Sequence, residues 1–391
     1  MLKKLSLILL IALLGCSSDT SDNQSTDSVD FPLRMKFSAV GGQGIFDPSV
    51  ALDPSTDTLW MSYSQVHPSV MWPDANPEVV GIRLASSTDG GKSWSDSGID
   101  LSAAHDVTVT TPNPEVKEGT WMSEVSQILY DPWEADSNKR WKMVWHHYLR
   151  LDHVTLTAAG MDSRLFQHGW LGLKEAATPA GLALAAEVKL FAAGGYDAEN
   201  DNTSGNTQSP VGGPPAIEYP TMTGTDSYVI TEPGLLAAAD GIFMSVVSFD
   251  ASANGAIHLL KYSRTNGIQD SGSWTYLGSP LSGSDAASMG YTGFSASELF
   301  QIEDETFLLV SPVSDAPWDD AYNGCMTFRF ADLNAAALEG SPTAIDFFQG
   351  DAGSFNGACE YDASLSYGFI YGQVYPGDSE MFRLYHSGIL P

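Results

Sequence analysis

One pattern recurs five times along the chain: an acidic residue in a small or polar context, an apolar strand-like run, a turn, and a stronger apolar run. The acids that open the five units are Asp47, Glu124, Glu232, Glu298 and Glu360. Such repetition indicates that each unit is a small sheet that must stack on its neighbours to bury its apolar faces. The repeat therefore predicts an all-β chain folded as a single β-propeller.

The number of units predicts five blades. The intervals between the acids suit four-stranded blades, except for the longer interval between Glu124 and Glu232, and a sixth blade in that interval is the alternative. We expect an insertion there instead, formed by a helix-like stretch at 171–193 and the loop that follows it. The fifth unit is one strand short, so the strand-like run 33–40 is expected to supply an outer strand and close the ring.

The composition indicates a large folded core and excludes one class of partner. Hydrophobic residues make up 43% of the chain and aromatic residues 11%, which excludes disorder over most of its length. The chain has 48 Asp and Glu against 18 Lys and Arg, a net charge of −30. Such a chain repels phosphate backbones, so no nucleic acid is expected to bind. We interpret the charge as a solvated surface and expect a monomer.

The first residues form a targeting segment. Lys3 and Lys4 precede an apolar run at 5–14 that is shorter than the about 20 residues of a membrane-spanning helix. The run ends in Leu-Leu-Gly-Cys16, which resembles the lipobox of bacterial lipoproteins. The resemblance implies a signal peptide at 1–15, a lipidated Cys16 that begins a flexible acidic tether at 16–30, and a propeller domain at 31–391. An ordinary signal peptide with a chance cysteine is the alternative.

The lipobox also implies a location. The chain would be anchored to the bacterial cell envelope, in the outer membrane, on its periplasmic or its surface face. The lipid would be its one contact with the membrane.

The two other cysteines and the metal-binding residue types point to a protein without a cofactor. Cys325 and Cys359 form an even pair for an oxidising compartment and predict a disulfide, with two buried thiols as the alternative. The Asp- and Asn-rich segment 197–206 is a weak candidate for calcium, because it lacks the alternating acids and central glycine of a calcium loop. We therefore expect no metal site and no cofactor.

A short motif supports the propeller fold. Residues 87–94 read STDGGKSW and resemble the Asp-box of sialidases and related propellers through Ser87, Asp89, Gly91 and Trp94. In such a turn the aspartate caps backbone N–H groups, glycine accepts a positive φ and tryptophan packs between blades. The resemblance implies a structural turn between the outer two strands of a blade. Sialidase activity itself is not expected, because the chain lacks the Phe-Arg-Ile-Pro opening of those enzymes.

The five repeated acids are the candidate functional residues. The first strand of each blade lines the axis of a propeller, so the acids are expected to converge as a ring of carboxylates. Packing alone does not favour this, because buried like charges repel one another. Glycoside hydrolysis does require two such groups: an acid that protonates the leaving oxygen and a carboxylate that acts as base or nucleophile. The alternative is that each acid only accepts hydrogen bonds from backbone or arginine.

The blade openings resemble those of five-bladed glycoside hydrolases of family 43 and of the invertase-like families. The resemblance implies that Asp47, in Phe-Asp-Pro, is the base and that Glu232, in Thr-Glu-Pro-Gly, is the acid. Glu124 stands where that family has an aspartate that modulates the pKa of the acid. Glu298 and Glu360 would be further acids of the channel.

Three functions follow from the sequence. The first is an envelope lipoprotein that hydrolyses glycans, with a glycan or other small molecule bound in the propeller funnel. The second is a non-catalytic propeller that binds a glycan or a protein. The third is a structural or assembly lipoprotein.

Overall fold

The computed structural model describes residues 30–35, 37, 42, 44–68, 78–110, 116–151, 169–191, 196–197, 202–203, 229–249, 255–314, 322–340, 345–348, 356–375 and 378–391. The predicted signal peptide, Cys16 and all of the tether except Asp30 lie outside these residues. Residues Phe31–Pro391 form one compact unit. Within the described part of the chain, no helix has the length and apolarity needed to cross a membrane.

The described strands form five blades in chain order, and the last and first blades are joined in one sheet. Blade 1 contains β2 (Gly44–Asp53), β3 (Thr58–Pro68), β4 (Glu78–Ser87) and β5 (Ser95–Ser102). Blade 2 contains β7 (Val116–Tyr130), β8 (Trp141–Leu151), β9 (Gly169–Ala176) and β10 (Val188–Phe191), with β6 (His105–Thr110) paired to the start of β7. Blade 3 contains β13 (Val229–Ala238), β14 (Gly241–Phe249), β15 (Gly255–Tyr262) and β16 (Trp274–Leu281).

The last two blades are less regular. Blade 4 contains β17 (Gly293–Ile302), β18 (Glu305–Val313) and β19 (Cys325–Asp332), and both β20 (Ala337–Leu338) and β21 (Ile345–Phe348) pair with β19. Blade 5 contains β22 (Asn356–Glu360), β23 (Ile370–Val374), β24 (Phe382–His386) and β1 (Leu33–Arg34). Outside the blades lie the β11 (Tyr196–Asp197) and β12 (Asn202–Thr203) pair, helix α1 (Gly283–Ser288), and 3₁₀ turns at Ser137–Lys139, Ala180–Ala183, Ser271–Ser273 and Leu333–Ala335.

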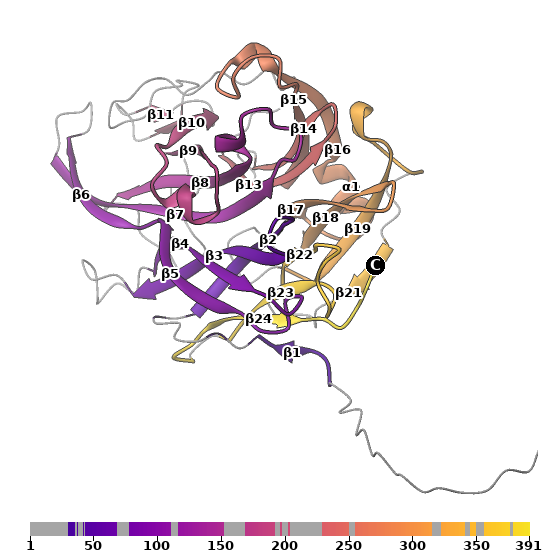
Figure 1. The fold of residues 1–391 in the computed structure, drawn as a ribbon, viewed down its shortest axis with the longest axis horizontal. Coiled ribbons are helices and arrows are strands. Elements are labelled where there is room, and N and C mark those ends of the chain that lie inside the picture. Colours follow the sequence, from indigo (N-terminus) through magenta and orange to yellow (C-terminus); the bar gives the residue numbers. More distant parts are fainter. Residues whose placement is uncertain are drawn as a thin grey trace, which may run out of the picture. The chain divides into compact units, whose positions relative to one another are not determined.

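The inner strands of the blades form a closed ring of five. β2 contacts β7, β7 contacts β13, β13 contacts β17, β17 contacts β22, and β22 contacts β2 again. Figure 1 shows the blades following one another around these strands, from indigo to yellow. The predicted five-bladed propeller is therefore confirmed, and the six-bladed alternative is wrong.

The N-terminal strand closes the ring, as the short fifth unit predicted. β1 runs antiparallel to β24, with Leu33 opposite His386, and so becomes the outer strand of blade 5. β24 also meets β2 of blade 1 at a single parallel pair, Gly44 with Phe382. The two ends of the domain are thus joined within one sheet, which leaves no open seam between the first and last blades.

The expected helix at 171–193 is wrong, and so is the interpretation of that stretch as an insertion. Its residues form β9 and β10, the outer strands of blade 2. Leu171 and Leu173 are fully buried on β9. Gly172 between them lies against the Trp145 ring, and a Cβ added to Gly172 would lie 2.7 Å from Trp145 Cζ2. Pairing with β8 and burial against the neighbouring blade override the helix propensity of the Ala- and Leu-rich sequence.

Two local predictions concern covalent and turn structure. The structure joins Cys325 of β19 to Cys359 of β22 in a disulfide, which links blades 4 and 5. Residues 88–94 connect β4 to β5, the outer strands of blade 1, and Gly90 and Gly91 there have positive φ. The Asp89 carboxylate accepts hydrogen bonds from the backbone and side chain of Ser93, and Trp94 is buried. This geometry is that of a capped structural turn.

Candidate active site

Each of the five inner strands carries a β-bulge at the same height. The register with the second strand of the blade shifts between Phe46 and Ser49, Glu124 and Gln127, Thr231 and Gly234, Ser295 and Glu298, and Gly357 and Glu360. These four-residue segments align the blades with one another, and we number their positions one to four. The structural repeat is therefore the bulge, and the acids occupy different positions within it.

The second position of every bulge is left-handed. Its residues have φ of 47–49° and are Asp47, Val125, Glu232, Ala296 and Ala358. None of them is glycine, and a left-handed residue with a side chain costs about 1–2 kcal/mol. Strain of this kind persists where the surroundings fix it and tends to gather at functional sites. The ring of bulges is therefore the first place to look for a site.

Hydrogen bonds between blades hold the bulges in place. The backbone N–H of Val125 donates to Ser64 Oγ (3.2 Å) of the preceding blade, and that of Ala358 donates to Ser311 Oγ (2.9 Å). The Ala296 N–H donates in the same way to Glu232 Oε2 (2.5 Å). One carboxylate oxygen of Glu232 thus accepts from a bulge N–H, as serine hydroxyls do elsewhere in the ring, and its other oxygen accepts from the Tyr322 hydroxyl.

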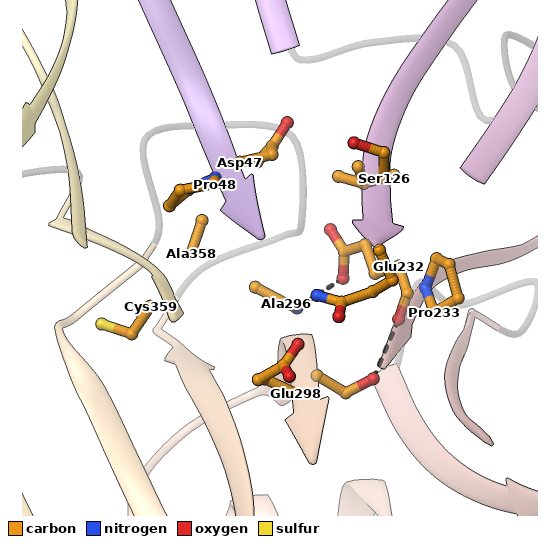
Figure 2. A pocket seen from close by; sticks show the side chains of 12 residues that line it. Asp47, Pro48, Ser126, Glu232, Pro233, Ala296, Glu298, Ala358 and Cys359 are labelled. Atoms are coloured by element: carbon orange, nitrogen blue, oxygen red, sulfur yellow. Dashed lines mark hydrogen bonds between the residues drawn. The ribbon is translucent and has the colours of Figure 1, made fainter. Parts of the chain in front are cut away.

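The bulges enclose a small pocket on the axis, which we call the bulge pocket. Its cavity is about 30 Å³, and its lining comes from all five blades. Figure 2 shows Asp47, Ser126, Glu232 and Glu298 on separate strands around it. The full lining is Asp47, Pro48, Val125, Ser126, Gln127, Glu232, Pro233, Ala296, Ser297, Glu298, Ala358 and Cys359.

Glu232 is buried and held by three donors. Ser295 Oγ and the Ala296 N–H donate to Oε2, both at 2.5 Å, and the Tyr322 hydroxyl donates to Oε1 at 2.8 Å. Burial raises the pKa of Glu232 above its ordinary value, and the three donors act in the opposite direction because they favour the carboxylate. The result is a fixed carboxyl group that projects into the bulge pocket.

Asp47 faces the same pocket with fewer donors. Burial, and to a smaller extent the negative charge of Glu232, raise its pKa to about 7, against hydrogen bonds from Ser64 and from the Val125 backbone that lower it. The negative charge of Glu232 thus disfavours the ionisation of Asp47 across the pocket.

Glu298 and Glu360 form a second pair, which we call the inner pair. Both occupy the fourth bulge position, and they are 5% and 1% exposed. Burial and then the proximity of Glu360 raise the pKa of Glu298 well above its ordinary value. Oε2 of each residue has no hydrogen-bonding partner. Two carboxylates cannot bond to each other because neither has a donor, so one of the two carboxyl groups must hold a proton before it can donate to the other. Glu360 Oε1 accepts from the Val50 N–H at 2.8 Å, so we place the proton on Glu298.

Glu124, the expected modulator, does not line the bulge pocket in the described structure. It occupies the first bulge position, and blade 2 presents Val125 at the second position. The offset of one residue matters because successive side chains on a strand point to opposite faces. The structure therefore brings Asp47, Glu232 and Glu298 together at the pocket, with Glu360 beside Glu298, and leaves Glu124 apart.

Sequence reasoning missed the residues that hold the acids, namely Tyr322, Ser295 and Ser64. Tyr322 lies 90 residues from Glu232 in the chain, in the connection after β18, so no local pattern marks it. One signal was available for the acids themselves. Asp47 and Glu232 alone among the five are followed directly by proline, and they alone occupy the left-handed position.

No metal site is apparent where the structure describes the chain. No group of three or more His, Cys, Asp or Glu residues is placed there to hold an ion. The candidate calcium segment 197–206 falls mostly outside the described residues.

Comparison with known proteins gives similarity in the fold alone. No family model matches the sequence, and no curated protein matches it. Among solved structures, an α-L-arabinofuranosidase from Lactobacillus brevis is 12% identical, with 78% of each chain covered and a TM-score of 0.44. An endo-arabinase from Bacteroides thetaiotaomicron is 11% identical (91% of this chain and 96% of that chain, TM-score 0.43). A β-fructofuranosidase from Bombyx mori is also 11% identical (90% and 60%, TM-score 0.48).

Proposed function

We propose that the protein is a glycoside hydrolase whose catalytic pair is Asp47 and Glu232. One observation carries the proposal: these are the two acids at the left-handed bulge position, they face one axial pocket, and burial raises the pKa of both. Hydrolysis of a glycosidic bond needs one carboxyl group that holds a proton and one that does not. A buried pair that shares a single proton supplies both at neutral pH.

The hydrogen bonds favour one distribution of that proton. Glu232 accepts from three donors, which stabilise its carboxylate, whereas Asp47 has a pKa of about 7 and holds a proton near neutral pH. This favours Asp47 as the proton donor and Glu232 as the base or nucleophile, the reverse of the roles that the resemblance implies.

The test of the proposed function is turnover of nitrophenyl glycosides, both furanosides and pyranosides. We expect Asp47→Asn and Glu232→Gln each to lose about 10²–10⁴-fold in kcat/KM, the usual contribution of a general acid or base. Asp304→Asn is the matched control, because Asp304 lies in the exposed β17–β18 turn. Absence of turnover by the wild type on every glycoside, or equal rates in all variants, would contradict the proposal.

A second assay assigns the two roles. A good leaving group needs no proton, so the variant that lacks the proton donor should keep most of its activity on dinitrophenyl glycosides. The hydrogen bonds predict that this variant is Asp47→Asn. The same result with Glu232→Gln would restore the roles that the resemblance implies.

Non-catalytic glycan binding is the second candidate function, and one observation favours it. Val125 occupies the bulge position of blade 2, where a third acid would assist the catalytic pair. A binding protein would retain glycan on an affinity column while the wild type shows no turnover. That outcome would favour the second function over hydrolysis.

We also propose that the chain is a lipoprotein of the bacterial envelope, lipidated at Cys16 and anchored in the outer membrane. The support is the sequence at 1–16. The test is metabolic labelling with a fatty-acid probe, which should label the wild type and not Cys16→Ser. Equal labelling of both, or none of either, would contradict this proposal.

A further inference from the structure

A second cavity lies on the axis beyond the inner pair, and we call it the far cavity. Its lining begins where the bulges end and follows the inner strands to their C-terminal ends. The cavity measures about 440 Å³, which falls within the range of about 300–1,000 Å³ that is usual for small-molecule sites. Trp133 in its lining is 47% exposed, so the cavity reaches solvent.

The walls of the far cavity are mainly apolar and aromatic. All five blades contribute leucine or an aromatic ring, and the aromatic residues are Tyr130, Trp133, Phe300 and Tyr361. Such a lining favours an organic ligand over a strongly hydrated metal ion. Aromatic rings also attract organic cations through the negative charge of their faces.

Glu298 lines both cavities and brings the charge of the inner pair to the far one, whose lining also contains the carboxyl group of Asp362. Its Oε2 atom is buried without a hydrogen bond, and so is Oε2 of Glu360 beside it. Among the described ion pairs, none joins a Lys, Arg or His side chain to either glutamate. With one shared proton the inner pair keeps one negative charge, and a buried charge without a counter-ion is costly.

We propose that the far cavity binds a small alkylammonium ion, with its ammonium group at Glu298 and its alkyl chain along the apolar wall. The cation neutralises the charge of the inner pair, and the alkyl chain covers the leucine and aromatic surface. The net charge of −30 also raises the concentration of cations around the protein. This site is separate from the proposed hydrolase, because it lies on the other side of the inner pair.

The test is calorimetry of the full chain with butylammonium, compared with butanol, butyrate and sodium. We expect saturable binding of butylammonium at one site, without net release of protons, because the cation balances the one negative charge that the inner pair keeps. Glu298→Gln should weaken binding about tenfold or more. Leu236→Trp should also weaken it, because it fills the apolar wall and leaves both carboxyl groups in place. Asp304→Asn is the control.

Several outcomes would overturn the proposal. They are absence of saturable binding by the wild type, equal binding of butanol, binding of sodium alone, and unchanged affinity in Glu298→Gln. Circular dichroism of each variant shows whether it is folded. If Glu298→Gln does not fold, Leu236→Trp and the comparison of butylammonium with butanol and sodium carry the test.

Discussion

Two pairs of carboxyl groups lie on the same five inner strands, and they differ in how the fold treats them. The proposed catalytic pair, Asp47 and Glu232, occupies the left-handed bulge position, and its members accept hydrogen bonds from serine, tyrosine and backbone groups. The inner pair, Glu298 and Glu360, occupies the fourth position, and one oxygen of each residue has no partner. The difference of two positions along a strand separates a pair suited to proton transfer from a pair that is a cost to the fold.

The comparison teaches that position within the bulge, more than residue type, decides what an axial acid can do. At the second position the side chain projects into the bulge pocket, where a substrate atom could reach it. At the fourth position it lies between the two cavities and meets another carboxyl group.

Loss of the disulfide should have the largest effect, and it should act through blade 5. Cys359 directly precedes Glu360 and is tied to Cys325, which lies 34 residues earlier in the chain. Chain entropy alone predicts a loss of about 3–4 kcal/mol for a loop of this size. Denaturant unfolding of the Cys325→Ser/Cys359→Ser variant measures it. Hydrolysis measured without denaturant should persist. An unchanged free energy of unfolding would show that the disulfide does not stabilise the region of the inner pair.

Tyr322→Phe should affect the catalytic pair alone. The change removes the donor to Glu232 Oε1, so the pKa of Glu232 should rise. The limb of the pH–rate profile that reflects the ionisation of Glu232 should therefore move to higher pH. We also expect about a tenfold loss of kcat/KM, the usual effect of removing one hydrogen bond to a charged group. A lower rate with an unmoved profile would assign Tyr322 a packing role.

Glu298→Gln should stabilise the protein, and more so as the pH rises. The pKa of Glu298 is raised in the folded state, so its contribution to stability is complete below its ordinary pKa of 4.5 and is lost as the pH rises through the raised value. A glutamine cannot ionise, and we expect a gain of about 1–2 kcal/mol at pH 8 and little gain at pH 4. Thermal unfolding at both pH values measures the difference. A gain of equal size at both would contradict the assignment.

Val125→Asn should have the smallest effect. Val125 is the blade 2 counterpart of Asp47 and Glu232, and a branched residue with φ of 47° is strained, whereas asparagine tolerates this conformation. We expect a gain in stability of about 0.5–1 kcal/mol. Its N–H bond to Ser64 is kept, so activity should not fall. A loss of stability would mean that the valine side chain contributes packing that outweighs the strain.

The fold could be predicted from the sequence because its determinants are local and repeated. Five units of alternating apolar runs and turns gave the blade number, and the short fifth unit gave the closing strand at Leu33–Arg34. The stretch 171–193 failed because helix propensity is local, whereas its true partners, β8 and the Trp145 ring, lie elsewhere in the chain.

The site could be predicted only in part. The sequence aligned the five acids as equivalent, but register within a bulge is set by pairing with the second strand of the blade, which an acid alone does not reveal. Asp47 and Glu232 both occupy the second bulge position and line the same pocket. Glu124 occupies the first position and Glu298 the fourth. Tyr322 and Ser295 reach Glu232 from another blade, through contacts that only the closed ring creates.

The central claim is that Asp47 and Glu232 act as one catalytic unit, and a double-mutant cycle on kcat/KM tests it most directly. The cycle compares Asp47→Asn, Glu232→Gln and the double variant with the wild type on one nitrophenyl glycoside. Residues that act as a unit are non-additive, so the double variant should be about as slow as the slower single variant. Losses that multiply would show that the two carboxyl groups act independently, and would contradict the account.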